Sequence, residues 1–118
     1  MPNPSLVFRS RLRFPHPGRG AFGPGKAELL EYIAATGSLR TAATEMAMSY
    51  QRAWTLVREM NGIFHGPLVV LSRGGGTGGG AALTPLGDEV LLRYQRMEAA
   101  CLAAIQPDWQ ALQGLLPK

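Results

Sequence analysis

The residues with the clearest potential for chemistry in this sequence are glycines. Six of the seven residues from Gly74 to Gly80 are glycine, and Gly74, Gly76 and Gly79 fit the spacing G-x-G-x-x-G. This spacing occurs in loops that bind the pyrophosphate of a dinucleotide, because glycine lets the backbone come close to the phosphates. The same composition is typical of a hairpin tip or a flexible linker. The glycines alone leave the three interpretations open.

Catalytic and metal-ligating patterns are weak elsewhere in the chain. The two histidines, His16 and His65, lie far from each other and from Cys101, without the spacing of a metal site. Cys101 lies in an apolar helical pattern and is predicted to be a small buried hydrophobic residue. No nucleophile with a base and no pair of carboxylates stands out as a catalytic arrangement. We therefore expect no enzyme activity, no metal and no cofactor.

The composition is typical of one globular domain. The chain has 118 residues, of which 46% are hydrophobic and 17% are charged. Its longest apolar run, Ala99–Ile105, is far shorter than the roughly 18 residues that indicate a membrane helix. The first residues lack the apolar segment of a signal peptide. We expect a cytoplasmic protein with no membrane partner and no small-molecule ligand.

Positive charge is concentrated in the first part of the chain. Residues 1–73 contain nine Lys and Arg against four Asp and Glu, whereas residues 74–118 contain three against four. A basic front suggests a polyanionic partner on one side of the molecule. The nearly neutral second part, residues 74–118, suggests a contact with something other than a polyanion.

The chain begins with a pattern typical of a strand, followed by a connection and a helix. Apolar and basic residues alternate over residues 6–14, as in a half-buried strand with arginines on its outer face. Glycine and proline over residues 15–25 predict a turn-rich connection. Apolar residues then recur at helical spacing over Lys26–Gly37, and Gly37 is suited to end that helix.

Two further helices with a tight turn between them are predicted next. A serine is suited to cap each of them, in residues 38–46 and 49–64. The small side chains of Ala42 and Ala43 would let the two helices cross closely. Trp54 lies at the border of the apolar face of the second of these helices and is expected to pack against a neighbouring helix.

A hairpin and a long helix complete the pattern. Residues 67–71 and 81–84 favour strands, with the glycine tract between them. A threonine cap and a proline then begin a long helix over residues 85–106. Pro107 is expected to end this helix, and residues 108–116 to form a short final one.

A helix-turn-helix followed by a hairpin predicts a winged helix. The fold class is α+β and mainly α, in the order β-α-α-α-β-β-α, within a single domain over residues 1–118. The helix-turn-helix occupies residues 38–64, the wing residues 67–84, and a helical dimerisation region residues 85–116.

Specific short motifs accompany this order. They are "GS" at Gly37–Ser38, "SYQRAW" at Ser49–Trp54, "MN" at Met60–Asn61, "GGGTGGGAALT" at Gly74–Thr84, and Gly87. With these motifs the chain resembles, over about residues 25–100, the N-terminal DNA-binding domain of the molybdate-responsive, ModE-type regulators, distant relatives of LysR-type DNA-binding domains. The resemblance implies a winged helix that dimerises and binds operator DNA.

Two departures from this family matter. Members that sense molybdate carry C-terminal oxyanion-binding domains, whereas this chain ends at Lys118, so we expect no molybdate sensing. The turn between the two helices often contains glycine in the family, whereas the candidates here are Ala47 and Met48. A left-handed conformation at Ala47 would cost roughly 1 kcal/mol.

The order of elements also decides the role of the glycines. A dinucleotide loop leads from a strand directly into a helix, whereas here a second strand precedes any helix. A phosphate-binding P-loop would need Gly-Lys-Ser or Gly-Lys-Thr, which is absent. We therefore interpret the glycine tract as the tip of the wing.

The candidate DNA-binding residues come from both helices and the wing. They are Arg40, Ser49, Tyr50, Gln51, Arg52, Thr55, Arg73, Gly75 and Thr77. Gln51, Arg52 and Thr55 would contact base edges or backbone, and the start of their helix would meet phosphate. The alternative for each side chain is an ordinary solvated position on the surface. For Tyr50, packing within the protein is favoured over contact with DNA.

The expected function is that of a regulator that binds double-stranded DNA at a palindromic operator as a homodimer. Apolar residues occupy so much of the circumference of the last long helix that a second face must be buried, which favours a dimer. An alternative is a winged-helix adaptor that binds another regulator instead of DNA.

Overall fold

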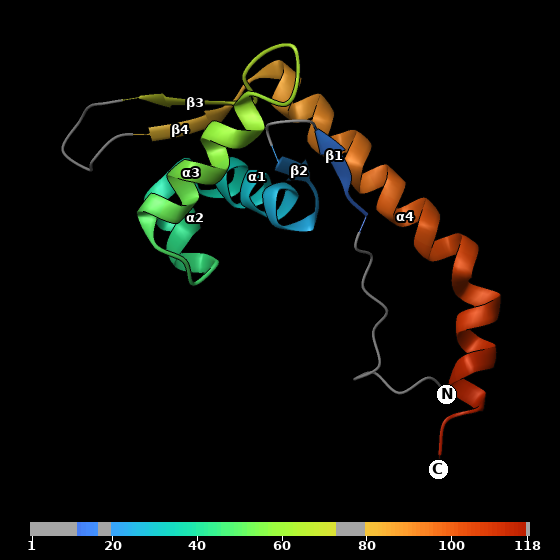
Figure 1. Ribbon diagram of the computed structural model, residues 1–118. Coiled ribbons are helices and arrows are strands. Elements are labelled where there is room, and N and C mark those ends of the chain that lie inside the picture. Colours follow the sequence, from blue (N-terminus) through green and yellow to red (C-terminus); the bar gives the residue numbers. More distant parts are fainter. Residues whose placement is uncertain (1–11, 17–19, 73–79, 118) are drawn as a thin grey trace.

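The computed structural model describes residues 12–16, 20–72 and 80–117, in which a β-hairpin, three helices, a second β-hairpin and one long helix follow one another (Figure 1). In chain order, the elements are β1 (Phe14–His16), β2 (Gly20–Phe22), α1 (Pro24–Thr36), α2 (Leu39–Glu45), α3 (Tyr50–Asn61), β3 (Val69–Ser72), β4 (Gly80–Leu83) and α4 (Pro85–Gly114). The structure confirms the mainly helical α+β class and the order of the three helices, the hairpin and the long helix. No helix among the described residues is long and apolar enough to cross a membrane.

The chain ahead of α1 differs from the expectation. Residues 6–11 of the expected strand lie outside the described residues. The expected connection over residues 15–25 was wrong, because β1 and β2 form an antiparallel hairpin in which Phe14 lies opposite Phe22. The two rings stack with their centroids 5.6 Å apart, and Phe22 is fully buried. Strands of three residues among glycines and prolines are too short for an alternating pattern, so only the packing of Phe22 reveals them.

The predicted helix caps are confirmed. Gly37 ends α1 in the left-handed conformation, with φ of 69°. The hydroxyl oxygens of Ser38, Ser49 and Thr84 each accept a hydrogen bond from a backbone N–H in the first turn of α2, α3 and α4. Ala47 adopts a φ of 55°, the one positive value at a non-glycine position among the described residues. The tight turn between α2 and α3 therefore carries the strain that the sequence predicts.

One hydrophobic core joins the three helices, the first hairpin and the base of the wing. Its largest fully buried side chains are Phe22, Leu29, Leu30, Ile33, Met60 and Leu68. The ring of Phe22 lies edge-on to the rings of Phe64 and Tyr94, with centroids 5.7 and 5.5 Å away. Through these rings the core reaches α4.

The wing is attached to the end of α3 through Asn61. The Asn61 side chain donates to the Val69 carbonyl over 3.0 Å and accepts from the backbone N–H groups of Leu68 and Val69 at 2.8 and 3.1 Å. One amide side chain thus makes hydrogen bonds to three backbone groups at the start of β3. Helix α3 ends here, three residues before the predicted end at Phe64, because residues 62–68 turn back toward the wing.

The other end of the wing is attached to the start of α4. The Thr84 hydroxyl donates to the Pro67 carbonyl over 2.7 Å, and the Thr84 N–H donates to the Leu68 carbonyl over 2.9 Å. Gly87 lies directly against Leu68, and a Cβ at Gly87 would come within 2.1 Å of the Leu68 carbonyl oxygen. Only glycine permits this approach of a helix to a backbone.

Helix α4 runs away from the other helices (Figure 1) as one continuous helix of 30 residues. The expected end at Pro107 was wrong, and residues 108–114 continue α4 instead of forming a separate helix. An interior proline lacks one N–H donor and crowds the preceding turn, which bends a helix without always ending it. Cys101, expected to be buried, is only partly buried, because the core of the described residues reaches α4 only in its first third, at Gly87 and Tyr94.

Candidate nucleic-acid interface

The turn between α2 and α3 holds these two helices in contact. The N–H groups of Ala47 and Met48 donate to the carbonyl oxygens of Thr44 and Ala43. Ala42 and Ala53 are fully buried, one on each helix. Small side chains at this crossing let α3 pack closely across α2, as a helix-turn-helix requires.

Packing gives α3 a buried face and an exposed face on opposite sides. Its buried residues are Ala53, Leu56, Val57 and Met60. At about 100° per residue, these four span an arc of about 100°. The exposed side chains of Gln51, Trp54, Thr55 and Arg58 span a similar arc on the opposite side. This exposed face is the part of α3 that the described chain leaves open to solvent.

Trp54 lies on the exposed face, so the expected packing against a neighbouring helix was wrong. Its side chain is 43% exposed, and its ring contacts the guanidinium of Arg58, 5.6 Å from the ring centroid. Periodicity places Trp54 only at a border, and no element of the described chain covers that border. Arg58, which was not among the candidate residues, lies near the middle of the exposed face.

Tyr50 is also exposed and links the two helices. Its side chain is 41% exposed, and the Arg40 guanidinium lies 4.7 Å from its ring centroid. A stacked guanidinium keeps N–H donors at its edge that can bind phosphate. Arg40 and Tyr50, both predicted to be near DNA, are therefore brought together at the start of α3.

The polar residues of α3 differ in what they still offer a partner. The Ser49 hydroxyl accepts from the Arg52 N–H over 3.0 Å, and its own hydrogen remains available as a donor. The Thr55 hydroxyl donates to the Gln51 carbonyl over 3.0 Å, so its outward contribution is a methyl group and an acceptor. The side chain of Gln51 is exposed on the same face.

Arg52 lies at the flank of the exposed face, close to α1. It lines a wide groove whose walls include Glu28 and Tyr32 of α1. The helix-turn-helix thus has Arg58 in the middle of its exposed face and Arg52 at one edge. The three candidate residues of the wing tip, Arg73, Gly75 and Thr77, lie outside the described residues.

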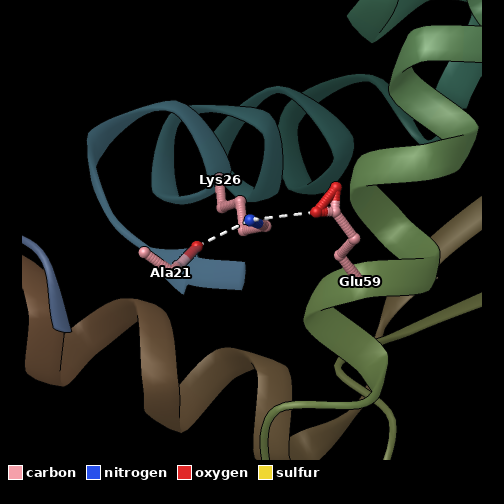
Figure 2. A network of polar contacts seen from close by, with 3 residues as sticks. All are labelled: Ala21, Lys26 and Glu59. Atoms are coloured by element: carbon pink, nitrogen blue, oxygen red, sulfur yellow. Dashed lines mark hydrogen bonds and ion pairs between the residues drawn. The ribbon is translucent and has the colours of Figure 1, made fainter. Parts of the chain in front are cut away.

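The charge of this surface is positive. Residues 38–61 contain three arginines against Glu45 and Glu59. Glu59 is paired with Lys26 of α1, with 3.7 Å between Nζ and a carboxylate oxygen, and Lys26 also donates to the Ala21 carbonyl over 2.6 Å (Figure 2). This pairing partly offsets the negative charge of Glu59, so the arginines dominate. Nowhere in the described part of the chain do three His, Cys, Asp or Glu side chains gather to hold a metal ion.

Comparison with known proteins agrees with this geometry. No protein-family model matches the chain. It is 42% identical over 77 residues to the molybdenum-pterin-binding protein MopB of Rhodobacter capsulatus, covering 65% of this chain and 28% of MopB. It is 38% identical over 71 residues to the DNA-binding transcriptional dual regulator ModE of Escherichia coli, covering 60% of this chain and 27% of that protein. The chain is a homologue of the N-terminal region of ModE regulators.

This homology confirms the resemblance to ModE that the sequence motifs indicate. A third relative, the molybdenum transport protein ModE of Herbaspirillum seropedicae, is 36% identical over 94 residues, which cover 75% of this chain and 35% of that protein. The chain thus spans about a third of the length of these relatives.

The structure gives two of the ModE-like motif residues a positioning role that periodicity does not predict. Asn61 fixes β3 at the end of α3, and Gly87 lets α4 lie against the Leu68 backbone. The only signals in the sequence are their places beside element boundaries: Asn61 after the last buried residue of α3, and Gly87 in the first turn of α4.

Proposed function

We propose that this chain is a sequence-specific DNA-binding regulator that acts by binding, not by catalysis, as a homodimer on a palindromic operator. The observation that carries the proposal is the exposed face of α3, which is held opposite a filled core and has Arg58 near its middle, with Arg52 and Arg40 beside it. A helix presented in this way fits the major groove of DNA. The homologous ModE of Escherichia coli is named a DNA-binding transcriptional dual regulator, which supports the same function here.

Helix α4 supports the dimer. Large apolar side chains are exposed along α4 and just beyond its end at Gly114. They are Leu92, Met97 and Leu112 on the helix, and Leu115 and Leu116 after it. A second copy that covers them would form a twofold dimer. Its two α3 helices would need to lie about 34 Å apart to read two half-sites one turn of DNA apart.

The test is binding of the whole chain to duplexes selected from a random library, measured over a range of salt concentrations. Phosphate contacts release counterions, so affinity is expected to fall with salt with a slope of about −0.9 per phosphate on a log–log plot. The selected sites are expected to be palindromic. Absence of duplex binding at low salt would contradict the proposal.

Two arginine variants refine this test. Arg52→Ala is expected to weaken specific binding by roughly 1–3 kcal/mol and to relax the preference at one base pair of each half-site. Arg93→Ala is the matched control, because Arg93 lies on α4, exposed and paired with Glu89. An equal loss on all sequences would make Arg52 a phosphate contact, and no loss would remove it from the interface.

The second candidate is an adaptor that binds another regulator, because the exposed rings of Tyr50 and Trp54 also suit a protein surface. Binding to DNA with a steep salt dependence separates the two functions. An adaptor would bind duplexes weakly and with no preference for sequence.

A further inference from the structure

The ring of Trp54 is not part of the hydrophobic core. Tryptophan contributes most to stability when it is buried, and α3 already fills the core with four other side chains. Trp54 instead lies on the opposite side with almost half of its surface exposed. A large apolar ring in this place is suited to an apolar feature of a partner.

The side chains around the Trp54 ring limit the kinds of partner that can bind there. Arg58 stacks on Trp54, and Arg40 stacks on the neighbouring exposed ring of Tyr50. Each exposed ring therefore has a positive charge against it. A purely apolar protein surface would leave these guanidinium groups without partners, which is costly on burial. A polyanion with small apolar groups between its charges satisfies both the arginines and the rings.

The major groove of DNA has this combination. Phosphates line its edges, and its apolar feature is the methyl group on C5 of thymine, which side chains detect by direct contact. Trp54 lies one turn after the start of α3, at the edge of the exposed face and next to Arg58. This turn belongs to the part of a recognition helix that contacts base edges. We propose that the Trp54 ring recognises a thymine methyl group in each half-site. This inference rests on the proposed function.

The chemistry recognised is a methyl group on C5 of a pyrimidine, which duplex DNA offers in thymine and in 5-methylcytosine. We assign thymine as the source. Uracil differs from thymine only in the absence of this methyl group and pairs identically with adenine. Replacing single thymines by uracil in a selected duplex therefore removes the methyl group and leaves hydrogen bonding unchanged.

The experiment measures the affinity of the whole chain for such duplexes. Unmodified protein is expected to lose about fourfold in affinity at one or two thymines of each half-site, the effect of exposing one methyl-sized group. Trp54→Ala is expected to bind the thymine and uracil duplexes equally at those positions. Arg58→Ala, the matched control on the same face, is expected to keep the uracil effect and to reduce the slope of the salt dependence by about one. At the same base pair, G·5-methylcytosine is expected to bind about fourfold more tightly than G·C.

Each contrary result has a distinct meaning. If the unmodified protein binds every uracil duplex as tightly as the thymine duplex, methyl recognition is overturned while DNA binding stands. This comparison uses only the unmodified protein, so it does not depend on the folding of a variant. If Trp54→Ala keeps the full uracil effect, another residue reads the methyl group. If the affinity gain appears only with 5-methylcytosine, thymine is the wrong source. If no duplex binds at all, the proposed function fails together with this inference.

Discussion

Helices α3 and α4 both begin with a hydroxyl cap, yet they relate to the rest of the chain in opposite ways. Helix α3 has 12 residues and buries four apolar side chains. Helix α4 has 30 residues and buries only Gly87 and Tyr94, both in its first third. The orientation of α3 is therefore fixed by its own chain, whereas the distal part of α4 buries no side chain among the described residues and exposes Leu112. A DNA-reading helix needs rigid placement, and a dimerisation helix needs exposed apolar side chains.

The largest effect is expected on dimerisation, from substitutions at the C-terminal end of α4. Leu112 and Leu115 are 55% and 80% exposed. Full burial of one leucine contributes roughly 1.5–3 kcal/mol, and a twofold dimer buries each leucine twice. The double substitution Leu112→Gln and Leu115→Gln is expected to weaken dimerisation by a factor of at least about 1,000 while α1 to α3 stay folded. Light scattering at micromolar concentration measures the change from dimer to monomer mass.

The matched control for this change is Gln110→Glu, on the same exposed part of α4. It is expected to remain a dimer. A dimeric double variant would mean that another surface joins the two chains, and a monomeric unmodified chain would remove the dimer altogether.

The next effect tests how α4 is fastened at its other end. A Cβ at position 87 would overlap the Leu68 backbone, which cannot move aside without shifting β3. Gly87→Ala is expected to lower the free energy of unfolding by roughly 1–3 kcal/mol, the range for overpacking a tight site. Chemical denaturation measures this change. Gly114→Ala is the control near the far end of the same helix, where a Cβ meets nothing within 4 Å, and it is expected to be neutral or slightly stabilising.

A smaller effect is expected at the junction of α3 and the wing. Asn61→Ala leaves the N–H groups of Leu68 and Val69 without their acceptor, at a cost of roughly 1–2 kcal/mol in the free energy of unfolding. Affinity for DNA is expected to fall further than stability alone explains, because the wing loses its fixed orientation. Asn61→Asp keeps the acceptor and loses the donor to Val69, so its effect separates the two halves of the contact. Equal DNA affinity in the unmodified chain, Asn61→Ala and Asn61→Asp would show that DNA binding does not need the Asn61 contacts to the wing.

The comparison of α3 with α4 also shows which features the sequence predicts. Caps and periodicity are local, so Ser38, Ser49 and Thr84 are assigned correctly, and the class and order of the elements follow. The role of Gly87 depends on a backbone 19 residues earlier in the chain, which no local pattern contains.

The errors have a similar origin. Whether Trp54 is covered depends on which elements pack beside α3, and its helical position only marks a border. Pro107 is predicted to end a helix because proline lacks one hydrogen-bond donor, whereas α4 continues through it to Gly114. The hairpin of β1 and β2 is too short to show a period and is held by the packing of Phe22.

The smallest effect is expected on the pH dependence of stability, at the place where the part of α4 that packs on the core meets its exposed part. Partial burial, together with the nearby carboxylate of Glu31, raises the pKa of Glu98 above the ordinary glutamate value. Gln95, one turn earlier on α4, donates to Glu31 over 3.3 Å, so the two helices approach each other here. A raised pKa means that the folded state binds a proton more readily than the unfolded state. Stability is therefore expected to fall as pH rises from the ordinary glutamate pKa through the raised one.

Glu98→Gln removes this charge and is expected to raise the melting temperature slightly at pH 7. Below the ordinary glutamate pKa, Glu98 is protonated in both states, so the variant and the unmodified chain are expected to melt alike. Thermal denaturation at both pH values measures the difference, with Glu89→Gln as a control at an exposed carboxylate paired with Arg93. A stabilisation of equal size at both pH values would contradict an effect of charge and indicate better packing of the amide. Loss of stability at pH 7 would mean that the ionised carboxylate has a favourable partner between α1 and α4.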